Sequence, residues 1–396
     1  MNAPIRPAVK GPFEDLTVLD LSRALAGPHA TMMMADMGAR VIKVEAPGTG
    51  DDTRGWGPPF VGPEEHREST YFLAANRGKE SIALDLKFEP DFQTLTRLVE
   101  KSDVLVENFR PGVMDRLGLS TEHLWTINPR LIILSISGFG HDGPDGGRAG
   151  YDQIVQGEAG LMSVTGGSAD NPTKVGVPIA DLLAGMYGAY GVAAALYERH
   201  LTGRGRIVRT SLLAAVVGVH AFQGTRWTVA GETPHPTGNH HAAIAPYGLF
   251  KCADGIIQLA VGSENQWHKL ATALALDPAK PEWATNAARV ENRADLIEEL
   301  EEELSRWTVA DALTVLTSTG IPCGKLRSIN EVYEWEQTRS QGLLLDVIHS
   351  TLGPITLPGP PVRYDDGFLT PTLPPPTLNE HGAIIRKWLS EENVAP

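Results

Sequence analysis

The sequence predicts an α/β protein with an open, Rossmann-like parallel sheet in a large domain and a smaller α+β domain. In the first 210 residues, short apolar runs rich in Val, Ile and Leu alternate with stretches of helical character, as is typical of parallel βαβ units. From about residue 231 this alternation gives way to loops, clustered histidines and one very acidic helix. A chain of 396 residues, 42% of them hydrophobic, is long enough to bury a core in both parts.

Six strands are expected in the large domain, because each is a short apolar run bounded by turn residues. They are Leu16–Leu21, Arg40–Glu45, Ser81–Leu86, Asp103–Glu107, Leu131–Ser137 and Ile207–Ser211. The helices expected with them are Ala26–Met37, Pro90–Glu100, Pro111–Leu117, Thr121–Ile127, Tyr151–Leu161, Asp181–Leu201 and Leu212–Val229. The helix from Asp181 is rich in Ala and Gly, which predicts close packing against another backbone.

The small domain has a weaker pattern. One strand is expected at Ile256–Val261, with helices at Trp267–Leu276, Arg293–Arg306 and Asp311–Ser318. Residues 231–255 are expected to be mostly loop. After about residue 327 the chain is Pro-rich and irregular, with a terminal helix near Ala383–Leu389.

These patterns place the domain boundaries as follows. The large domain takes residues 1–210 and is completed by 331–396, and the small domain takes 231–325. Residues 211–230 and 326–345 are expected to be linkers.

The bulk composition excludes several classes of protein. A net charge of −14 argues against nucleic-acid binding, which needs clustered Lys and Arg. The two cysteines, Cys252 and Cys323, form neither a disulfide framework nor a zinc pattern, so we expect no metal site and a reducing cytoplasm. We find no signal peptide and no apolar run of membrane-spanning length, and therefore expect no membrane association.

The common nucleotide-binding motifs are absent. The turn after the first strand reads DLSRALAGP (20–28), without the G-x-G-x-x-G of dinucleotide enzymes, and no P-loop sequence occurs. A nicotinamide oxidoreductase, which the α/β alternation alone would allow, is therefore disfavoured.

Residues 108–112 (NFRPG) suggest an anion site. They follow a strand and open a helix with Pro at its first turn, so free backbone N–H groups together with Arg110 could hold a phosphate. The alternative is a plain strand-to-helix turn with a solvated arginine. Arg116 lies one to two turns further on.

Asp181, at the start of the Ala/Gly-rich helix, has two interpretations that remain open. It is either an N-cap or a carboxylate nucleophile, kept ionised by the helix end. Backbone N–H groups at the same helix start are candidate oxyanion donors. His235, His240 and His241 cluster in a loop without the ligand set of a metal site, so either a binding loop or a solvated loop fits them.

Taken together, the segments of this chain resemble the class III CoA-transferase (CaiB/BaiF) family, which includes formyl-CoA transferase, carnitine CoA-transferase and α-methylacyl-CoA racemase. The resemblance covers nearly the whole chain, and the order of the segments makes it specific. The segments are LDLSRALAGP (19–28), GARVIKVEAPGTGDDTRGW (38–56), NRGK (76–79) with LD (84–85), DVLVENFRPGVMDRLGL (103–119), NPRLIILSISGFG (128–140), YDQIVQGEAGLMSVTG (151–166), GVPIADLLAGMYGAYGVAAALYERHLTGRG (176–205), GNHH with APYGLFKCADG (238–255) and GIPCG (320–324).

The resemblance implies roles for individual residues. The family's nucleophilic aspartate matches Asp181, and acyl-CoA is implied as the substrate, with no permanently bound cofactor. The implied CoA-binding residues are Ala24, Leu25, Ala46, Leu84, Asn108, Phe109, Arg116 and Phe139, to which we add Arg110, Arg148 and Tyr151. Ala46 and Ser137 stand where the formyl-CoA enzyme has Arg and Lys, so some phosphate contacts must differ. Arg23, His240 and His241 are candidates for binding the substrate's second carboxylate.

The implied activity is transfer of CoA from an acyl-CoA donor, such as succinyl-CoA, to a carboxylic acid. It would proceed through an aspartyl anhydride and an aspartyl-CoA thioester on Asp181. The family's mobile glycine loop is not preserved at 238–248, which argues against formate or oxalate as substrate. An intertwined homodimer is also implied.

Two alternatives stay open beside transfer. A racemase or epimerase is disfavoured because Tyr151 stands where family racemases have His, and a tyrosine is a poor second acid/base group. A CoA-binding protein without catalysis is disfavoured by the intact Asp181.

Overall fold

The computed structural model describes residues 11–364, 367–368, 371 and 373–391. They form two compact units. The first unit takes its residues from 1–159, 175–225 and 336–396, and the second from 160–174 and 226–335. The domain limits expected from the sequence stay a prediction. Residues 1–10 and 392–396, at the ends of the predicted large domain, lie outside the described residues.

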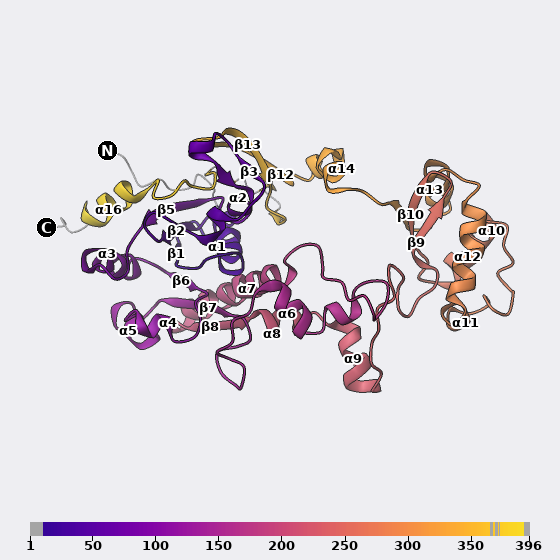
Figure 1. Ribbon diagram of the computed structural model, residues 1–396, viewed down its shortest axis with the longest axis horizontal. Helices are drawn as coiled ribbons and strands as arrows, with labels where there is room; N and C mark the ends of the chain where they lie inside the picture. Colours follow the sequence, from indigo (N-terminus) through magenta and orange to yellow (C-terminus); the bar gives the residue numbers. More distant parts are fainter. Residues whose placement is uncertain (1–10, 365–366, 369–370, 372, 392–396) are drawn as a thin grey trace. The chain divides into compact units, whose positions relative to one another are not determined.

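The first unit is built on a six-stranded sheet with the order β5-β2-β1-β6-β7-β8, in which every pairing is parallel (Figure 1). Its strands are β1 (Thr17–Asp20), β2 (Arg40–Glu45), β5 (Lys79–Ala83), β6 (Val104–Glu107), β7 (Ile132–Ser137) and β8 (Ile207–Ser211). The middle strands are buried on both faces, because helices cover the sheet on both sides. The predicted open parallel α/β sheet is confirmed.

The described residues of the first unit contain ten α-helices. They are α1 (Ala26–Asp36), α2 (Thr70–Ala75), α3 (Glu89–Glu100), α4 (Val113–Arg116), α5 (Thr121–Ile127), α6 (Asp152–Glu158), α7 (Ile179–Thr202), α8 (Leu212–Gly218), α15 (Glu336–Ser340) and α16 (Gly382–Glu391). Helix α9 (Ala221–Ala230) carries the chain from the first unit into the second.

Helix α7 packs closely against its neighbours, as its small residues predict. A Cβ atom on Gly185 would lie 2.6 Å from the backbone oxygen of Ala26 in α1, and one on Gly191 would lie 2.6 Å from a methyl group of Val208 in β8. By length and apolar composition, this 24-residue helix could cross a membrane, so the expectation that no run is long enough was wrong. The core helix of an α/β layer passes the same test, and α7 packs on α1, β7 and β8.

The single helix predicted at 212–229 is two helices. It breaks at Val219 and His220, where the His220 Nε2 atom contacts the carbonyl oxygen of Ala159 at 2.8 Å. Ala221 then takes the left-handed conformation, with φ of 47°, and a right-handed helix cannot continue through it.

The segment after residue 327 is more regular than its proline content suggests. It contains an antiparallel hairpin of β12 (Leu344–His349) and β13 (Gly353–Pro358), so the expectation of an irregular tail was wrong. The chain then returns to the edge of the large sheet. Ala83 of β5 donates its N–H to the Asn379 side chain (2.9 Å), while Ser81 donates its N–H to the His381 ring atom Nδ1 (3.2 Å) and accepts a bond from the His381 N–H (3.0 Å).

The second unit has its own sheet and core. Strands β9 (Tyr247–Cys252), β10 (Gly255–Ala260) and β11 (Cys323–Lys325) pair antiparallel in the order β11-β10-β9. Strand β9 falls in the stretch expected to be loop. The helices are α10 (Glu264–Ala273), α11 (Asn286–Glu291), α12 (Arg293–Leu304), α13 (Val309–Ser318) and α14 (Ile329–Glu334). Trp267 and Trp283 are the largest side chains in the buried core of this unit.

The remaining short elements connect these parts. They are the strands β3 (Phe60–Val61), β4 (Glu68–Ser69), β14 (Arg363–Tyr364) and β15 (Gly367–Phe368) and the 3-10 turns Asp52–Gly55, Glu64–His66 and Met162–Val164.

Candidate active site

A cavity of about 480 Å³ lies in the first unit, beyond the carboxyl ends of β1, β6 and β7. Ligands of open parallel sheets bind at this edge, where loops from several strands converge. We call it the Asp181 cavity, after the carboxylate that α7 contributes to its wall. Eight residues singled out from the sequence line it: Arg23, Ala24, Asn108, Phe109, Arg110, Arg148, Tyr151 and Asp181.

Asp181 lies in the first turn of α7 but does not cap it. The helix begins two residues earlier, at Ile179, and the Asp152 side chain takes the capping role. The Oδ1 atom of Asp152 accepts hydrogen bonds from the N–H of Ala180 (2.8 Å) and of Asp181 (3.4 Å). The interpretation of Asp181 as an N-cap was therefore wrong, because the Asp181 carboxylate does not cap the helix.

Burial, and after it the nearby carboxylate of Asp152, raises the pKa of Asp181 to about 7. The expectation of a strongly ionised group was wrong, because desolvation penalises the charged form more than the helix end favours it. The side chain is thus divided between acid and carboxylate near neutral pH.

The first N–H groups of α7 already have acceptors. Ile179 donates to Val177 O (2.8 Å), Leu182 donates to Pro178 O (3.1 Å), and the two N–H groups between them bind Asp152. The oxyanion donors predicted at this helix start are therefore engaged within the protein.

The turn after β1 holds a strained residue against the cavity. Ala24 has a left-handed backbone with φ of 63°, which costs a non-glycine residue about 1 kcal/mol or more. Its N–H donates to Asp51 Oδ1 (3.2 Å), and the Asp51 carboxylate pairs with the buried Lys43 at 2.8 Å. Next to it, Arg23 and Asn108 exchange two hydrogen bonds, of 2.8 and 2.7 Å. The turn is thus fixed from two sides.

The arginines around the cavity differ in their partners. Arg148 forms a bidentate pair with Glu158 and lies over the Phe139 ring at 4.5 Å. Arg23 and Arg110 have no ion pair within the described ranges, although the Arg23 guanidinium lies 5.8 Å from the centre of the Phe109 ring. These two arginines are the cations available to an anionic substrate.

A second, mainly apolar cavity of about 420 Å³ lies at the ends of β2 and β5, and we call it the Leu84 cavity. Ala46 and Leu84, both predicted to contact CoA, line it together with Lys87. Arg23 and Phe109 line both this cavity and the Asp181 cavity.

Comparisons with known proteins agree on one family. The sequence model of CoA-transferase family III matches residues 13–382. Succinyl-CoA:glutarate CoA-transferase of Mus musculus is 38% identical over 380 residues, covering 95% of this chain and 86% of that protein. Acetyl-CoA:oxalate CoA-transferase of Acetobacter aceti is 40% identical over 395 residues, covering 98% of this chain and 97% of that protein. The crystal structure of a CaiB/BaiF family protein from Brucella suis is 40% identical, with a TM-score of 0.86 over 96% of this chain and 100% of that one.

The chain belongs to CoA-transferase family III.

This CoA-transferase does not bring all the predicted residues to the two cavities. Leu25 and Phe139 are buried, with 6% and 8% of their surfaces exposed, and line neither cavity. Arg116 also lines neither. The helix expected from Pro111 is the single turn α4, which begins at Val113, and the Val113 N–H is bonded to Arg110 O. One amide of the predicted row is therefore already engaged within the protein, and the anion site there stays a prediction.

His240 and His241 lie in the second unit. The His241 ring stacks on Tyr247 with ring centres 5.2 Å apart, and the His240 ring meets Phe250 edge-on at 5.6 Å. Both rings are thus held within their own unit, and their role in substrate binding stays a prediction.

Several residues of the Asp181 cavity were not predicted from the sequence. Tyr71, Trp56 and Asp152 line it beside Asp181, and burial, followed by the charges of Asp181 and Asp152, raises the pKa of Tyr71. Trp56 belongs to the family segment 38–56 and Asp152 to the segment 151–166. The family resemblance could therefore have pointed to both residues. Tyr71 lies outside those segments, so the resemblance could not have pointed to it.

Proposed function

We propose that this enzyme transfers CoA from a dicarboxylic acyl-CoA, such as succinyl-CoA, to a second carboxylic acid, with Asp181 as the nucleophile. The observation that carries the proposal is the Asp181 carboxylate in the wall of a cavity at the carboxyl edge of the sheet. It has no capping role, no ion pair among the described residues and a pKa near neutrality.

The two cavities suggest how acyl-CoA binds. The Leu84 cavity is mainly apolar and suits the flat adenine ring, with Lys87 at its wall. The Asp181 cavity then receives the thioester, and Phe109 and Arg23 line the passage shared by both. Arg23 and Arg110 are available to the diphosphate or to a substrate carboxylate.

The proposed reaction has four balanced steps. The Asp181 carboxylate attacks the thioester carbonyl, forming an acyl-aspartyl anhydride and releasing CoA thiolate. The thiolate attacks the aspartyl carbonyl, which forms an aspartyl-CoA thioester and releases the donor acid as its carboxylate. The acceptor carboxylate attacks this thioester, giving a new anhydride and thiolate. The thiolate then attacks the acyl carbonyl, which yields the new acyl-CoA and restores Asp181. No net proton is consumed.

The names of the two relatives support a dicarboxylic substrate. Their donors differ, succinyl-CoA in one and acetyl-CoA in the other, while both acceptors, glutarate and oxalate, are dicarboxylates. We infer that the acceptor here is also a dicarboxylate, and that one unpaired arginine binds its distal carboxylate. A panel of dicarboxylates tested with succinyl-CoA and acetyl-CoA, with products read by mass spectrometry, would identify the pair.

The role of Asp181 is tested with Asp181→Asn. Because Asp152 caps α7, we expect this variant to unfold at the wild-type temperature and to lose CoA transfer. Wild-type enzyme given acyl-CoA alone should form an adduct on the peptide that contains Asp181, which hydroxylamine converts to a hydroxamate. Transfer by a folded Asp181→Asn protein, shown not to have deamidated, would end the proposal.

The same samples separate the alternatives. A racemase would wash solvent deuterium into the α-carbon of the acyl group, which transfer does not require. A protein that only binds CoA would show a dissociation constant for CoA but no exchange of label between acids.

A further inference from the structure

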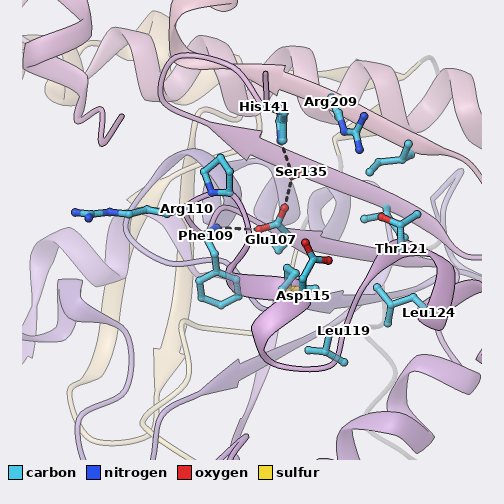
Figure 2. Close-up of a pocket in the computed structure, with 15 residues that line it drawn as sticks. Glu107, Phe109, Arg110, Asp115, Leu119, Thr121, Leu124, Ser135, His141 and Arg209 are labelled. Carbon is cyan, nitrogen blue, oxygen red and sulfur yellow. Dashed lines mark hydrogen bonds between the residues drawn. The ribbon is translucent and has the colours of Figure 1, made fainter. Parts of the chain in front are cut away.

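A third cavity, of about 210 Å³, lies beside β6 and β7 and is lined by Glu107, Ser135, His141, Arg209 and Asp115, among others (Figure 2). We call it the Glu107 cavity. Unlike the Leu84 cavity, it is mainly polar, and the resemblance to the family assigns it no role. Phe109 lines this cavity as well as the other two, so the Phe109 ring separates it from the space proposed for acyl-CoA.

Glu107 holds Phe109 by its backbone. The Oε2 atom of Glu107 accepts a hydrogen bond of 2.9 Å from the Phe109 N–H. The exchange of hydrogen bonds between Asn108 and Arg23 ties the preceding residue to the turn after β1, and the Phe109 ring packs against the apolar core. The Glu107 carboxylate therefore contributes directly to the position of the Phe109 backbone, and through it to that of the ring.

Glu107 is a buried acid without a counter-ion. Only 6% of its surface is exposed, and no ion pair reaches it in the part of the chain that the structure describes. Its Oε1 atom accepts a short hydrogen bond from the Ser135 hydroxyl, and burial raises the pKa of the Glu107 carboxyl. Figure 2 shows the Arg110 side chain pointing away from it.

A chain of hydrogen bonds joins this carboxylate to His141. The Ser135 Oγ atom lies 2.7 Å from His141 Nε2, and Figure 2 shows Glu107, Ser135 and His141 in succession. The serine lies between acid and imidazole, whereas a hydrolytic triad needs the imidazole in the middle. The arrangement therefore does not activate a nucleophile. With Glu107 ionised, His141 donates to Ser135 and Ser135 donates to Glu107. With Glu107 protonated, the direction of both bonds reverses.

We propose that Glu107 is a positioning residue for acyl-CoA binding: its ionised carboxylate fixes Phe109, and its protonation loosens Phe109 and weakens binding of the CoA ester. An N–H bond to a carboxylate is stronger than one to a neutral carboxylic acid, so loss of the charge weakens the link to the Phe109 backbone. The other charged groups around this cavity are His141, Arg209, Asp115 and Arg110, with Asp142 acting on His141. The proposal rests on the proposed function for its ligand, but not for the link between Glu107 and Phe109.

The binding test uses Asp181→Asn, in which the proposed chemistry is blocked, with acetyl-CoA as the probe. Calorimetry from pH 5.5 to 8 gives the dissociation constant of acetyl-CoA for Asp181→Asn alone and for the double variant that also carries Glu107→Gln. The glutamine keeps a hydrogen-bond acceptor but cannot ionise. The ratio of the two constants cancels the titration of CoA itself. We expect at least threefold tighter binding with Glu107 at pH 8 and a ratio of the two constants that approaches one as the pH is lowered. A ratio that does not change with pH would overturn the proposal.

Two variants locate the effect. Ser135→Ala removes a hydrogen bond to the ionised carboxylate, so the midpoint of the pH change should move to higher pH. Asp115→Asn is the matched control, because Asp115 lines the same cavity while the Phe109 N–H is bonded to Glu107, and the midpoint of this variant should stay where it is. An unchanged midpoint in Ser135→Ala, or an equal shift to higher pH in Asp115→Asn, would count against Glu107.

A measurement without ligand separates this proposal from the proposed function. Hydrogen exchange of the Phe109 amide is read by mass spectrometry in the protein with Glu107 and in Glu107→Gln, and the two rates are expressed as a ratio. The protection that Glu107 gives to this amide should fall as the pH is lowered, with the same midpoint as the binding of acetyl-CoA. If acetyl-CoA does not bind and no transfer occurs, the proposed function fails, while this ratio still tests the link. An unchanged ratio across the pH range would refute the link whatever the enzyme's activity.

Discussion

Two carboxylates with opposite tasks lie side by side at the start of α7. Asp152 accepts hydrogen bonds from two backbone N–H groups and so caps the helix, while its negative charge disfavours ionisation of Asp181. The cap that orders the helix therefore also disfavours the reactive, ionised form of the proposed nucleophile. If Asp181 has that role, we expect this coupling to make the activity sensitive to pH close to neutrality.

The pH dependence of transfer follows from this pKa. The carboxylate is the reactive form, and with a pKa of about 7 it is depleted as the pH falls below neutrality. We expect the turnover rate with saturating acyl-CoA to rise with pH and level off above about pH 8. Initial rates between pH 5.5 and 9 would measure this, and a profile that is already flat at pH 6 would contradict it.

Asp152→Asn should shift that profile. An Asn side chain still caps α7, but it removes the negative charge beside Asp181, so the midpoint should move to lower pH. It should not return to the ordinary aspartate value, since burial, the larger cause, remains. The control is Gln156→Met, which loses the hydrogen bond from Gln156 to Asp152 (2.7 Å) but keeps the Asp152 charge. Its midpoint should match that of the wild type.

At the level of elements, the helix that carries Asp181 is placed by its glycines. Gly185 faces a backbone oxygen of α1, which cannot move without displacing that helix, while Gly191 faces the end of a Val208 side chain. The same addition of one methyl group therefore meets two different obstacles within one helix.

Gly185→Ala should thus destabilise the protein and Gly191→Ala should not. Overpacking against α1 costs about 1–3 kcal/mol, and the gain in helix propensity recovers about 1 kcal/mol at most. At Gly191 the Val208 methyl group can rotate away, so the two effects should nearly cancel. Urea denaturation with a constant m value would report both free energies of unfolding. Equal losses of unfolding free energy in the two variants would show that the close contact with α1 does not determine how α7 packs.

The sequence predicted the strands that are buried along their whole length more readily than one strand whose burial alternates among prolines. Strands β2 and β7 are buried along their whole length and were predicted within one residue of their bounds. Strand β12 is buried only at alternate residues and lies near many prolines, so its pattern was obscured. In the site, resemblance supplied Asp181, but its pKa and its freedom from capping could not be predicted. Both depend on burial and on Asp152, which lies 29 residues away in the sequence.

For the whole molecule, we predict an intertwined homodimer. The family resemblance implies it, and the apolar side chains left exposed on α7 and α9 in a single chain are consistent with a partner. Tyr190, Tyr197, Leu201, Trp227 and Val229 each expose 60% of their surface or more. Light scattering at micromolar concentration should give about twice the chain mass of 42.7 kDa. A stable species of one chain mass would contradict this.

The return of the chain to the edge strand β5 has a consequence for biosynthesis. The second unit is nearly continuous in sequence, whereas the first unit needs residues on both sides of it. A ribosome therefore delivers all of the second unit before it delivers Asn379 and His381, which cover the edge of the larger sheet. Until then the nascent chain presents β5 as an open strand edge, which is a template for pairing with other chains. The part of the protein that is translated first is thus completed last, and it is in this interval that a chaperone would have most to protect.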